Sequence, residues 1–479
     1  MIRYPPGADP SVQQTGPTLQ RVLGLWSAIS IVIGTVIGSG VFLVPSTMIR
    51  YVGSVEKLFF IWIVAGLLSL FGALTYAELA AALPEAGGEY VYLSAAYGPF
   101  WGYLYGWTQF WVGKSGSIAT LAAGFYTYLT AFVPILGTPL VVLPFHIGPG
   151  GTLLEIHYGQ LVAIAIILIL AGVNYVGVRS GGNLQVFVTA IKLLLIAAIV
   201  VLGIFSGNGH FSQLHMRIPS PGTISAFFAA MVSALWAYDG WNNVSMVSSE
   251  IRNPQRNLPR ALILGTAVVI ATYLLINLAY FYVLTPAEVA SSHRVAADMM
   301  SGLYGTLAAA GVTIAVLISI FAALNGSILS GSRVPYAMAR DGLFFRSAAA
   351  VHPVYRTPGN AMIMLSGWSC IVVLSGWFDD LYNFVIFGNW ILYLLTAISV
   401  FVLRRKYPTL PRPYRVLGYP LVPVLFCVVA LLLLISTIQT RPRESFMGLA
   451  LMALGVPFYI YWKRKTARTI PPINQTFPA

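Results

Sequence analysis

Long apolar stretches alternate with short polar segments along almost the whole chain. A helix needs about 20 mostly apolar residues to cross a bilayer. Windows of that length, separated by charged or proline-rich breaks, predict twelve membrane-spanning helices and an all-α membrane protein. The windows lie near residues 25–49, 57–82, 97–131, 159–178, 183–206, 223–248, 260–285, 302–332, 359–377, 380–403, 418–439 and 445–462.

Two of the predicted spans contain an interruption. The first span carries glycines from Gly34 to Gly40, in the sequence IVIGTVIGSGVFLVPS, and the sixth carries WAYDG at 236–240. Each unpaired backbone polar group in hydrocarbon costs several kcal/mol, so a break at this depth is expected only where the freed backbone lines a cavity. Breaks five spans apart predict an inverted repeat of five helices, with the binding site at the repeat interface.

This repeat predicts the organisation of the chain. The expected parts are a cytoplasmic tail at 1–20, a first five-helix repeat at 21–206, a second at 207–405, and the last two spans with a short tail at 406–479. The halves share no repeat of residues, so the symmetry rests on the positions of the breaks.

Composition and charge agree with a membrane protein. Of 479 residues, 58% are hydrophobic and 9% charged, and the mean hydropathy is +0.79. The net charge of +13 is concentrated in the loops on the side of the N-terminus, which follows the positive-inside rule and places both termini in the cytoplasm. The bilayer, and not a nucleic acid, is therefore the expected partner of these cations. The polar N-terminus predicts no cleavable signal peptide.

The metal-binding residue types are scattered. All six histidines fall in predicted loops. Cys370 and Cys427 fall inside apolar spans, where a free cysteine behaves as a small hydrophobic residue. We therefore expect neither a metal site nor another cofactor, and the pattern argues against an intramembrane enzyme.

Glu78 and Lys114 are charged residues at the end of one predicted span and within another. Glu78, at the cytoplasmic end of span two, is expected to pair with a loop arginine. Lys114 lies midway along span three, where insertion of a lysine costs about 2.5–3.5 kcal/mol, so it needs a partner or water. A cavity wall is favoured over extension of its ammonium to the membrane surface.

Lys192 lies deep within span five. Its ammonium must find carbonyl or hydroxyl oxygens, which the broken first span offers near Gly34 and span eight offers at Asn325 and Ser327. In one interpretation the lysine is a fixed cation that bridges these spans and takes part in transport. In the other it only links the helices structurally. A buried lysine also changes its protonation readily, which leaves proton coupling open.

The second break contains Asp239 and follows Trp236. The carboxylate either pairs with a polar neighbour such as Lys114 or faces a cationic side chain of a substrate. Trp236 is either a core aromatic residue or a lid over the site. Backbone N–H groups after Gly38, at the positive end of a half-helix, would hold a carboxylate, and carbonyls near Trp236 would accept an ammonium. The two ends together select a zwitterion such as an α-amino acid.

Seven blocks carry a family resemblance: GTVIGSGVF (34–42), YAELAAALPEAGGEYVYL (76–93), LWAYDGWNN (235–243), EIRNPQRNLPRAL (250–262), LNGSILSGSR (324–333), FGNW (387–390) and LRRKYPTLPRPYRV (403–416). Over residues 20–435 the chain resembles the L-type amino acid transporters of the amino acid–polyamine–organocation superfamily, in a bacterial form. The resemblance implies a LeuT-type fold, with spans one and six discontinuous. It also implies sodium-independent transport of amino acids, usually by exchange.

The resemblance also implies roles for individual residues. The turn that binds the substrate carboxylate matches Gly38, Ser39 and Gly40. The carbonyls that take the α-amino group belong to positions that match Val36, Trp236 and Asp239, with Ala237 in the same break. Trp236 matches the aromatic gate. Ser117 and Asn389 match side-chain pocket positions, and Lys192 matches the lysine that stands in for a sodium site.

One departure concerns a partner chain. Eukaryotic relatives are linked to a heavy chain through a cysteine in the loop after span three, and residues 134–158 contain no cysteine. We expect no disulfide-linked heavy chain. The sequence thus predicts an exchanger of neutral, and secondarily cationic, L-amino acids in the cell membrane. The alternatives are a proton-coupled amino acid symporter and, in another class, an amino acid-sensing membrane receptor.

Overall fold

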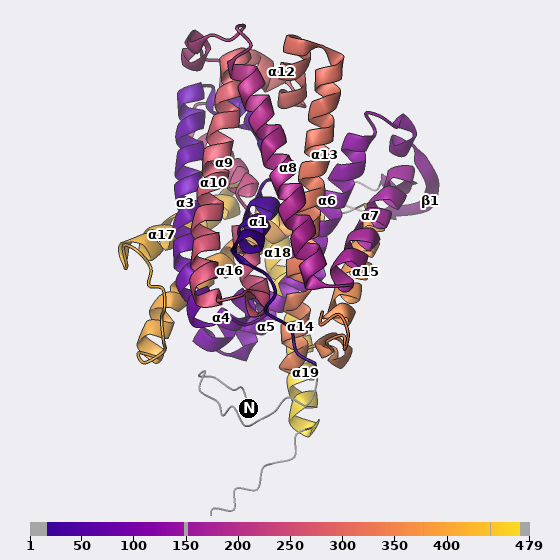
Figure 1. Ribbon diagram of the computed structural model, residues 1–479, viewed down its shortest axis with the longest axis vertical. Helices are drawn as coiled ribbons and strands as arrows, with labels where there is room; N and C mark the ends of the chain where they lie inside the picture. The colour runs from indigo at the N-terminus through magenta and orange to yellow at the C-terminus, as the bar shows by residue number, and fades with distance from the viewer. Residues whose placement is uncertain (1–16, 148–151, 377, 441, 470–479) are drawn as a thin grey trace, which may run out of the picture.

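The first predicted span consists of two helices that meet at an angle. In the computed structural model, which describes residues 17–147, 152–376, 378–440 and 442–469, α1 (Leu25–Val36) and α2 (Gly40–Val52) are bent by 41° across a three-residue break. The remaining helices pack around this pair in an elongated bundle (Figure 1).

The other elements follow in chain order. They are α3 (Val55–Ala82), α4 (Glu89–Tyr97), α5 (Pro99–Thr108), η1 (Gln109–Gly113), α6 (Lys114–Leu129), η2 (Pro134–Gly137), β1 (Pro139–Ile147), β2 (Thr152–His157), α7 (Tyr158–Tyr175), α8 (Val178–Ile204), η3 (Phe211–His215), α9 (Ile224–Ala237) and η4 (Trp241–Glu250). The second half comprises α10 (Pro254–Val283), α11 (Pro286–Ser291), α12 (Val295–Tyr304), α13 (Thr306–Gly331), α14 (Arg333–Arg340), η5 (Arg346–Ala349), α15 (Gly359–Ser375), α16 (Phe378–Lys406), α17 (Leu421–Thr440), α18 (Pro442–Ala453) and α19 (Gly455–Thr469).

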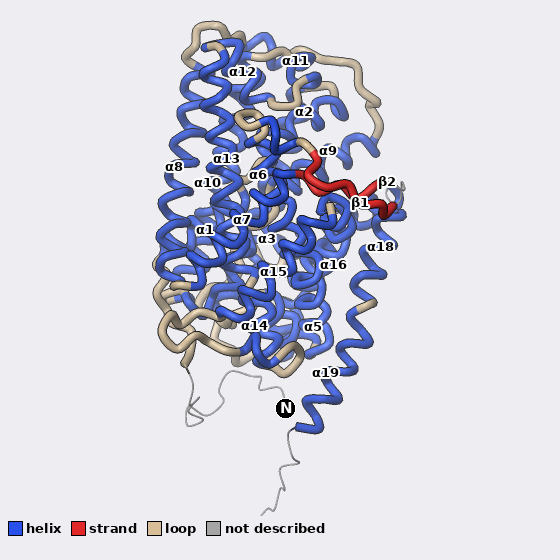
Figure 2. Tube along the Cα trace, turned by 90° about the vertical axis from the view of Figure 1, so that its right-hand side faces the viewer, coloured by secondary structure: helices blue, strands red, loops and turns tan. Residues whose placement is uncertain are grey.

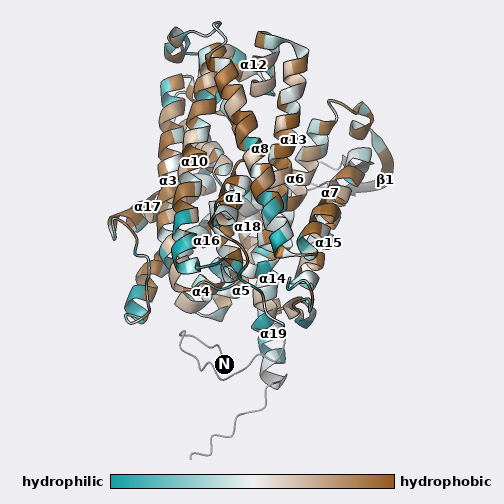
Figure 3. Cartoon of the chain, in the orientation of Figure 1, coloured by the Kyte–Doolittle hydropathy of each residue, from teal (hydrophilic) through white to brown (hydrophobic). Residues whose placement is uncertain are grey.

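Helices occupy all of the predicted windows, but several windows are divided. Within the described residues, eight helices are long and apolar enough to cross a membrane, or nine if α1 and α2 count as one span. The third window holds α5, η1 and α6, the sixth holds α9 and η4, and the last holds α18 and α19. The long helices are mostly apolar along their length, with more hydrophilic residues near α14 and α19 (Figure 3). The chain is therefore a multi-pass membrane protein.

The prediction of an all-α chain missed one β-hairpin. Strands β1 and β2 pair antiparallel, with Val142 opposite Glu155, in the segment expected to be a loop. The hairpin lies at the side of the helical bundle (Figure 2). Its sequence PLVVLPFHI contains valines and an aromatic residue, which favour strands, but a run this short does not distinguish a strand from an apolar loop.

Helix α1 lies at the centre of the bundle. Its residues from Ala28 to Val36 are all buried, and it packs against α8, α10 and α13. A helix that is apolar on all sides is expected to be surrounded by protein or lipid. Two glycines allow close approach: a Cβ at Gly265 of α10 would lie 2.6 Å from Val32, and one at Gly326 of α13 would lie 2.4 Å from Thr35.

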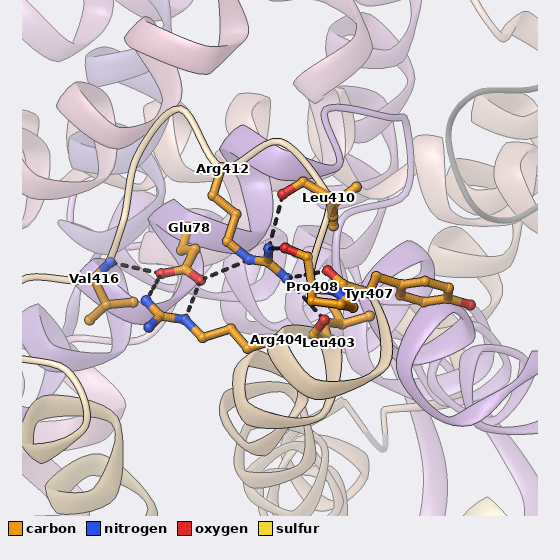
Figure 4. A network of polar contacts seen from close by, with 8 residues as sticks. All are labelled: Glu78, Leu403, Arg404, Tyr407, Pro408, Leu410, Arg412 and Val416. Atoms are coloured by element: carbon orange, nitrogen blue, oxygen red, sulfur yellow. Dashed lines mark hydrogen bonds and ion pairs between the residues drawn. The ribbon is translucent and has the colours of Figure 1, made fainter.

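The end of the bundle near α4 is tied together by Glu78, as the sequence predicted for this carboxylate. Arg404, near the end of α16, donates two hydrogen bonds to it at 2.8 and 2.6 Å. Arg412, in the loop after α16, lies 3.6 Å from it, and the Val416 N–H donates to it at 2.8 Å (Figure 4). The pairing of Glu78 with a loop arginine is confirmed.

Candidate functional site

The break between α1 and α2 exposes helix-end backbone groups. Ile37 has an extended conformation with φ −76° and ψ 91°, and the Gly38 N–H donates to the Val36 carbonyl at 2.9 Å. Helix α2 begins at Gly40, and the first N–H groups of a helix have no acceptor within it. They carry the partial positive charge of the helix dipole. This turn is therefore suited to an anion such as a carboxylate.

The break between α9 and η4 presents the opposite polarity. Helix α9 ends at Ala237, and Gly240 has φ 107°, a left-handed conformation that favours glycine. The Asp239 N–H donates to the Trp236 carbonyl at 3.1 Å. The last carbonyls of a helix carry partial negative charge, so this end is suited to a cation.

The two breaks pack directly against each other. A Cβ at Gly40 would lie 3.1 Å from the Ala237 Cα, and one at Gly240 would lie 3.2 Å from the Thr35 carbonyl oxygen. The Thr35 hydroxyl donates to the Gly240 carbonyl at 2.9 Å. The positive end of one half-helix and the negative end of another therefore meet at one place in the core of the bundle.

Tyr273 of α10 holds both breaks. It is fully buried, and its hydroxyl donates to the Ala237 carbonyl at 2.7 Å and to the Val36 carbonyl at 3.1 Å. Because the Val36 carbonyl also accepts from Gly38, the α9 carbonyl depends more heavily on this hydroxyl. Tyr273 therefore fixes the spacing between the two helix ends.

A cavity of about 90 Å³ lies between the breaks. The residues of the sequence-predicted site that line it are Val36, Gly38, Ser39, Gly40, Ser117, Trp236, Ala237, Asp239 and Ser327. Its other walls include Thr35, Lys114, Thr120, Leu121, Gly124, Gly240, Asn243 and Ile320. A void lined by both interruptions is the arrangement that the sequence predicted.

Two charged side chains of opposite sign face this cavity. Lys114 is the first residue of α6 and directly follows the π-helical turn η1. Its ammonium donates a hydrogen bond to the Asn243 side chain. Asp239 accepts a hydrogen bond from the Tyr393 hydroxyl at 2.8 Å. π-helical turns are frequent at functional sites. Both charges thus have polar partners in the protein beside the space for a ligand.

Lys192 of α8 binds the end of α1 from the side. It is fully buried, and its ammonium donates to the carbonyls of Gly34 at 3.0 Å and Ile37 at 2.6 Å. The Ser319 hydroxyl of α13 donates to the carbonyls of Ile37 at 2.9 Å and Gly38 at 3.0 Å. The carbonyls freed by the break are therefore held by a cation and a hydroxyl from two other helices.

The structure shows other contacts for the two α13 residues that the sequence suggested as oxygen donors to Lys192. Ser327 lies on the wall of the cavity. Asn325 donates to the Gln185 side chain at 2.7 Å and accepts from Asn174 at 2.8 Å, in a buried network between α7, α8 and α13. Ser319, two turns earlier on the helix, supplies the hydroxyl at the break.

Asn389 lies in a recess that adjoins the cavity, not in the cavity itself. This recess is also lined by Trp236, Asp239 and Tyr393. The Asn389 side-chain oxygen accepts from Gln109 of η1 at 3.1 Å. Its predicted role as a side-chain pocket residue stays a prediction.

Sequence reasoning missed Tyr273, Ser319, Thr35 and Tyr393, although each binds a break or its carboxylate. A single hydroxyl in an apolar span has no sequence signal that separates it from an ordinary core residue. Thr35, inside the GTVIGSG block, was the one that its position could have indicated.

Comparisons with known proteins agree with this geometry. A family model described as "Amino acid permease" matches residues 23–456. The chain is 33% identical to the mouse b(0,+)-type amino acid transporter 1, covering 95% of this chain and 91% of the relative. It is 32% identical to the serine/threonine exchanger SteT of Bacillus subtilis, covering 94% and 98%. It is 30% identical to the mouse Asc-type amino acid transporter 1, covering 93% and 82%. This chain belongs to the amino acid permease family, among the L-type amino acid transporters.

Proposed function

We propose that this protein is a sodium-independent amino acid exchanger. The observation that carries the proposal is that two helix breaks of opposite polarity face one buried cavity. The N–H groups at Ser39 and Gly40 would bind the substrate carboxylate, and carbonyls at the end of α9 would bind the α-ammonium. Relatives named as exchangers and amino acid transporters support the same activity.

Small neutral L-amino acids are the preferred substrates in this proposal. The cavity is small, with a volume of about 90 Å³, which favours amino acids with short side chains such as alanine or serine. Asp239 is hydrogen-bonded to Tyr393 and shares the cavity with the Lys114 ammonium, so its charge is partly compensated. Cationic amino acids come second. Trp236 would cover the bound substrate as a gate.

Lys192 explains independence from sodium in this proposal. Its ammonium already binds the carbonyls of Gly34 and Ile37, which a sodium ion would otherwise coordinate. The fixed cation would hold the end of α1 without an ion that dissociates at each cycle. Ser117 and Asn389 would contact the substrate side chain. Ser327 lines the same cavity.

The architecture proposed for transport has twelve spans. Two inverted repeats, at 21–206 and 207–405, would rock one helix bundle against the other, with both termini in the cytoplasm and the protein in the cell membrane. The loop after span three has no cysteine, so the chain is proposed to work without a disulfide-linked heavy chain. No enzymatic step is part of the proposal.

The test is counterflow with the purified chain alone in proteoliposomes. Radiolabelled L-serine uptake is measured with and without internal L-serine, with sodium replaced by choline. Exchange predicts rapid uptake only in loaded vesicles, unchanged by choline. Uptake into empty vesicles driven by an imposed pH gradient would instead establish a proton symporter. Saturable binding without any flux would establish a receptor.

A further inference from the structure

A second cavity lies on the outer side of the bundle, away from the breaks. It has a volume of about 680 Å³ and lies between the start of α1, the first turns of α10 and the loop after α16. The residues on which the inference rests are Leu25, Arg256, Pro259, Arg260, Leu264 and Tyr414. This groove is larger than the central cavity and plays no part in the proposed exchange.

The groove changes from charged to apolar along α10. Arg256 and Arg260 are one helical turn apart and exposed, and Leu264, 49% exposed, follows on the next turn of the same face. The exposed apolar stripe continues with Val268 and Leu275 toward the middle of the helix. A phospholipid has the same polarity, with a charged head group followed by acyl chains.

The two guanidinium groups have no acidic partner among the described residues. Among the described residues, the arginines that form ion pairs are Arg217, Arg333, Arg404 and Arg412, and neither groove arginine is one of them. Glu78, which anchors the adjacent loop, is already bound by two of these. The groove therefore carries an uncompensated charge that suits an anion.

The loop wall of the groove is held in place. Pro413 and Tyr414 lie between Arg412 and Val416, both of which bind Glu78 (Figure 4). The groove is therefore formed by the fold itself. Trp26, next to Leu25, is 74% exposed. Because tryptophans concentrate at the membrane–water interface, it indicates that this end of the groove lies at the level of the lipid head groups.

We propose that this groove binds an anionic phospholipid of the leaflet on the N-terminal side of the membrane. Arg256 and Arg260 bind the head-group phosphate, and an acyl chain lies along Leu264 and Ile263, which also lines the groove. Basic pockets between membrane helices are suited to such head groups. The apolar continuation of the groove favours a lipid over free phosphate, since an inorganic anion has no use for it.

Native mass spectrometry of lipid adducts tests the site. The purified protein is mixed with phosphatidylglycerol or phosphatidylcholine in detergent, and the Arg256→Gln/Arg260→Gln variant is compared with wild type. Each basic residue near an anionic head group strengthens binding about fivefold, so the double variant is expected to bind phosphatidylglycerol about thirtyfold more weakly. Binding of phosphatidylcholine is expected to change little.

Arg346→Gln/Arg464→Gln is the matched control, because it removes the same charge from two exposed arginines outside the groove. It should bind phosphatidylglycerol as the wild type does. Equal weakening by both double variants, or none by the groove variant, would overturn the site. Complete competition by inorganic phosphate would show that a free anion, not a lipid, occupies it. Equal melting temperatures in lipid-free detergent confirm that both variants are folded, and none of these measurements requires transport.

Discussion

Replacement of Tyr273 by phenylalanine tests whether the hydroxyl that bonds to both helix breaks is needed for exchange. The substitution removes one oxygen and leaves the packing of the ring unchanged. The Val36 carbonyl keeps its bond from Gly38, whereas the Ala237 carbonyl loses the hydroxyl that donates to it at 2.7 Å. A buried carbonyl left without its partner costs about 1–3 kcal/mol.

If that cost falls on the substrate-bound arrangement of the breaks, exchange slows about 5- to 150-fold. The assay is counterflow of L-serine over a range of external concentrations, which separates the maximal rate from the apparent affinity. Tyr304→Phe is the control, because its exposed hydroxyl donates to the Leu202 carbonyl at 3.1 Å, far along the bundle. Exchange by Tyr273→Phe at the rate and affinity of the control would refute a role for this hydroxyl in setting the site.

Three further substitutions test other contacts. Lys192→Met removes two charge-assisted hydrogen bonds, each contributing about 1.5–3 kcal/mol. The counterflow rate of this variant is expected to fall at least about a hundredfold. The control Lys57→Met, at an exposed position, should keep the wild-type exchange rate. Gly40→Ala places a Cβ 3.1 Å from Ala237 and should weaken L-serine binding by about 1–3 kcal/mol in calorimetry, whereas Gly24→Ala, with open space around it, should not. Glu78→Gln should lower the melting temperature, because a buried charge-assisted network is worth about 1.5–3 kcal/mol, and an unchanged value would contradict that assignment.

The sequence predicted the parts of the site that have a backbone signature. Glycines at Gly38 and Gly40 and the WAYDG segment are costly inside hydrocarbon unless they serve a function, so they mark the breaks. A lysine as deep as Lys192 needs oxygens nearby, and the Gly34 carbonyl is one of those it found. Both inferences rest on residues whose placement inside hydrocarbon costs free energy, so that their presence indicates a specific role.

The contacts that the sequence did not predict involve residues with no such cost. Tyr273 and Ser319 are ordinary in an apolar span, and only the packing of α10 and α13 brings their hydroxyls to the breaks. The position of Ser327 on the cavity wall also follows from the packing of α13. The pairing of β1 with β2 and the π-helical turn before Lys114 likewise had no distinct signal in the sequence.

The central claim is that two helix ends of opposite polarity bind the two charges of one amino acid. A cryo-EM structure with bound L-serine tests it most directly. The account predicts the serine carboxylate within hydrogen-bonding distance of the N–H groups at Ser39 and Gly40, and the ammonium at the carbonyls that end α9. Serine bound outside this cavity, or held by side chains alone with both helix ends uninvolved, would contradict it.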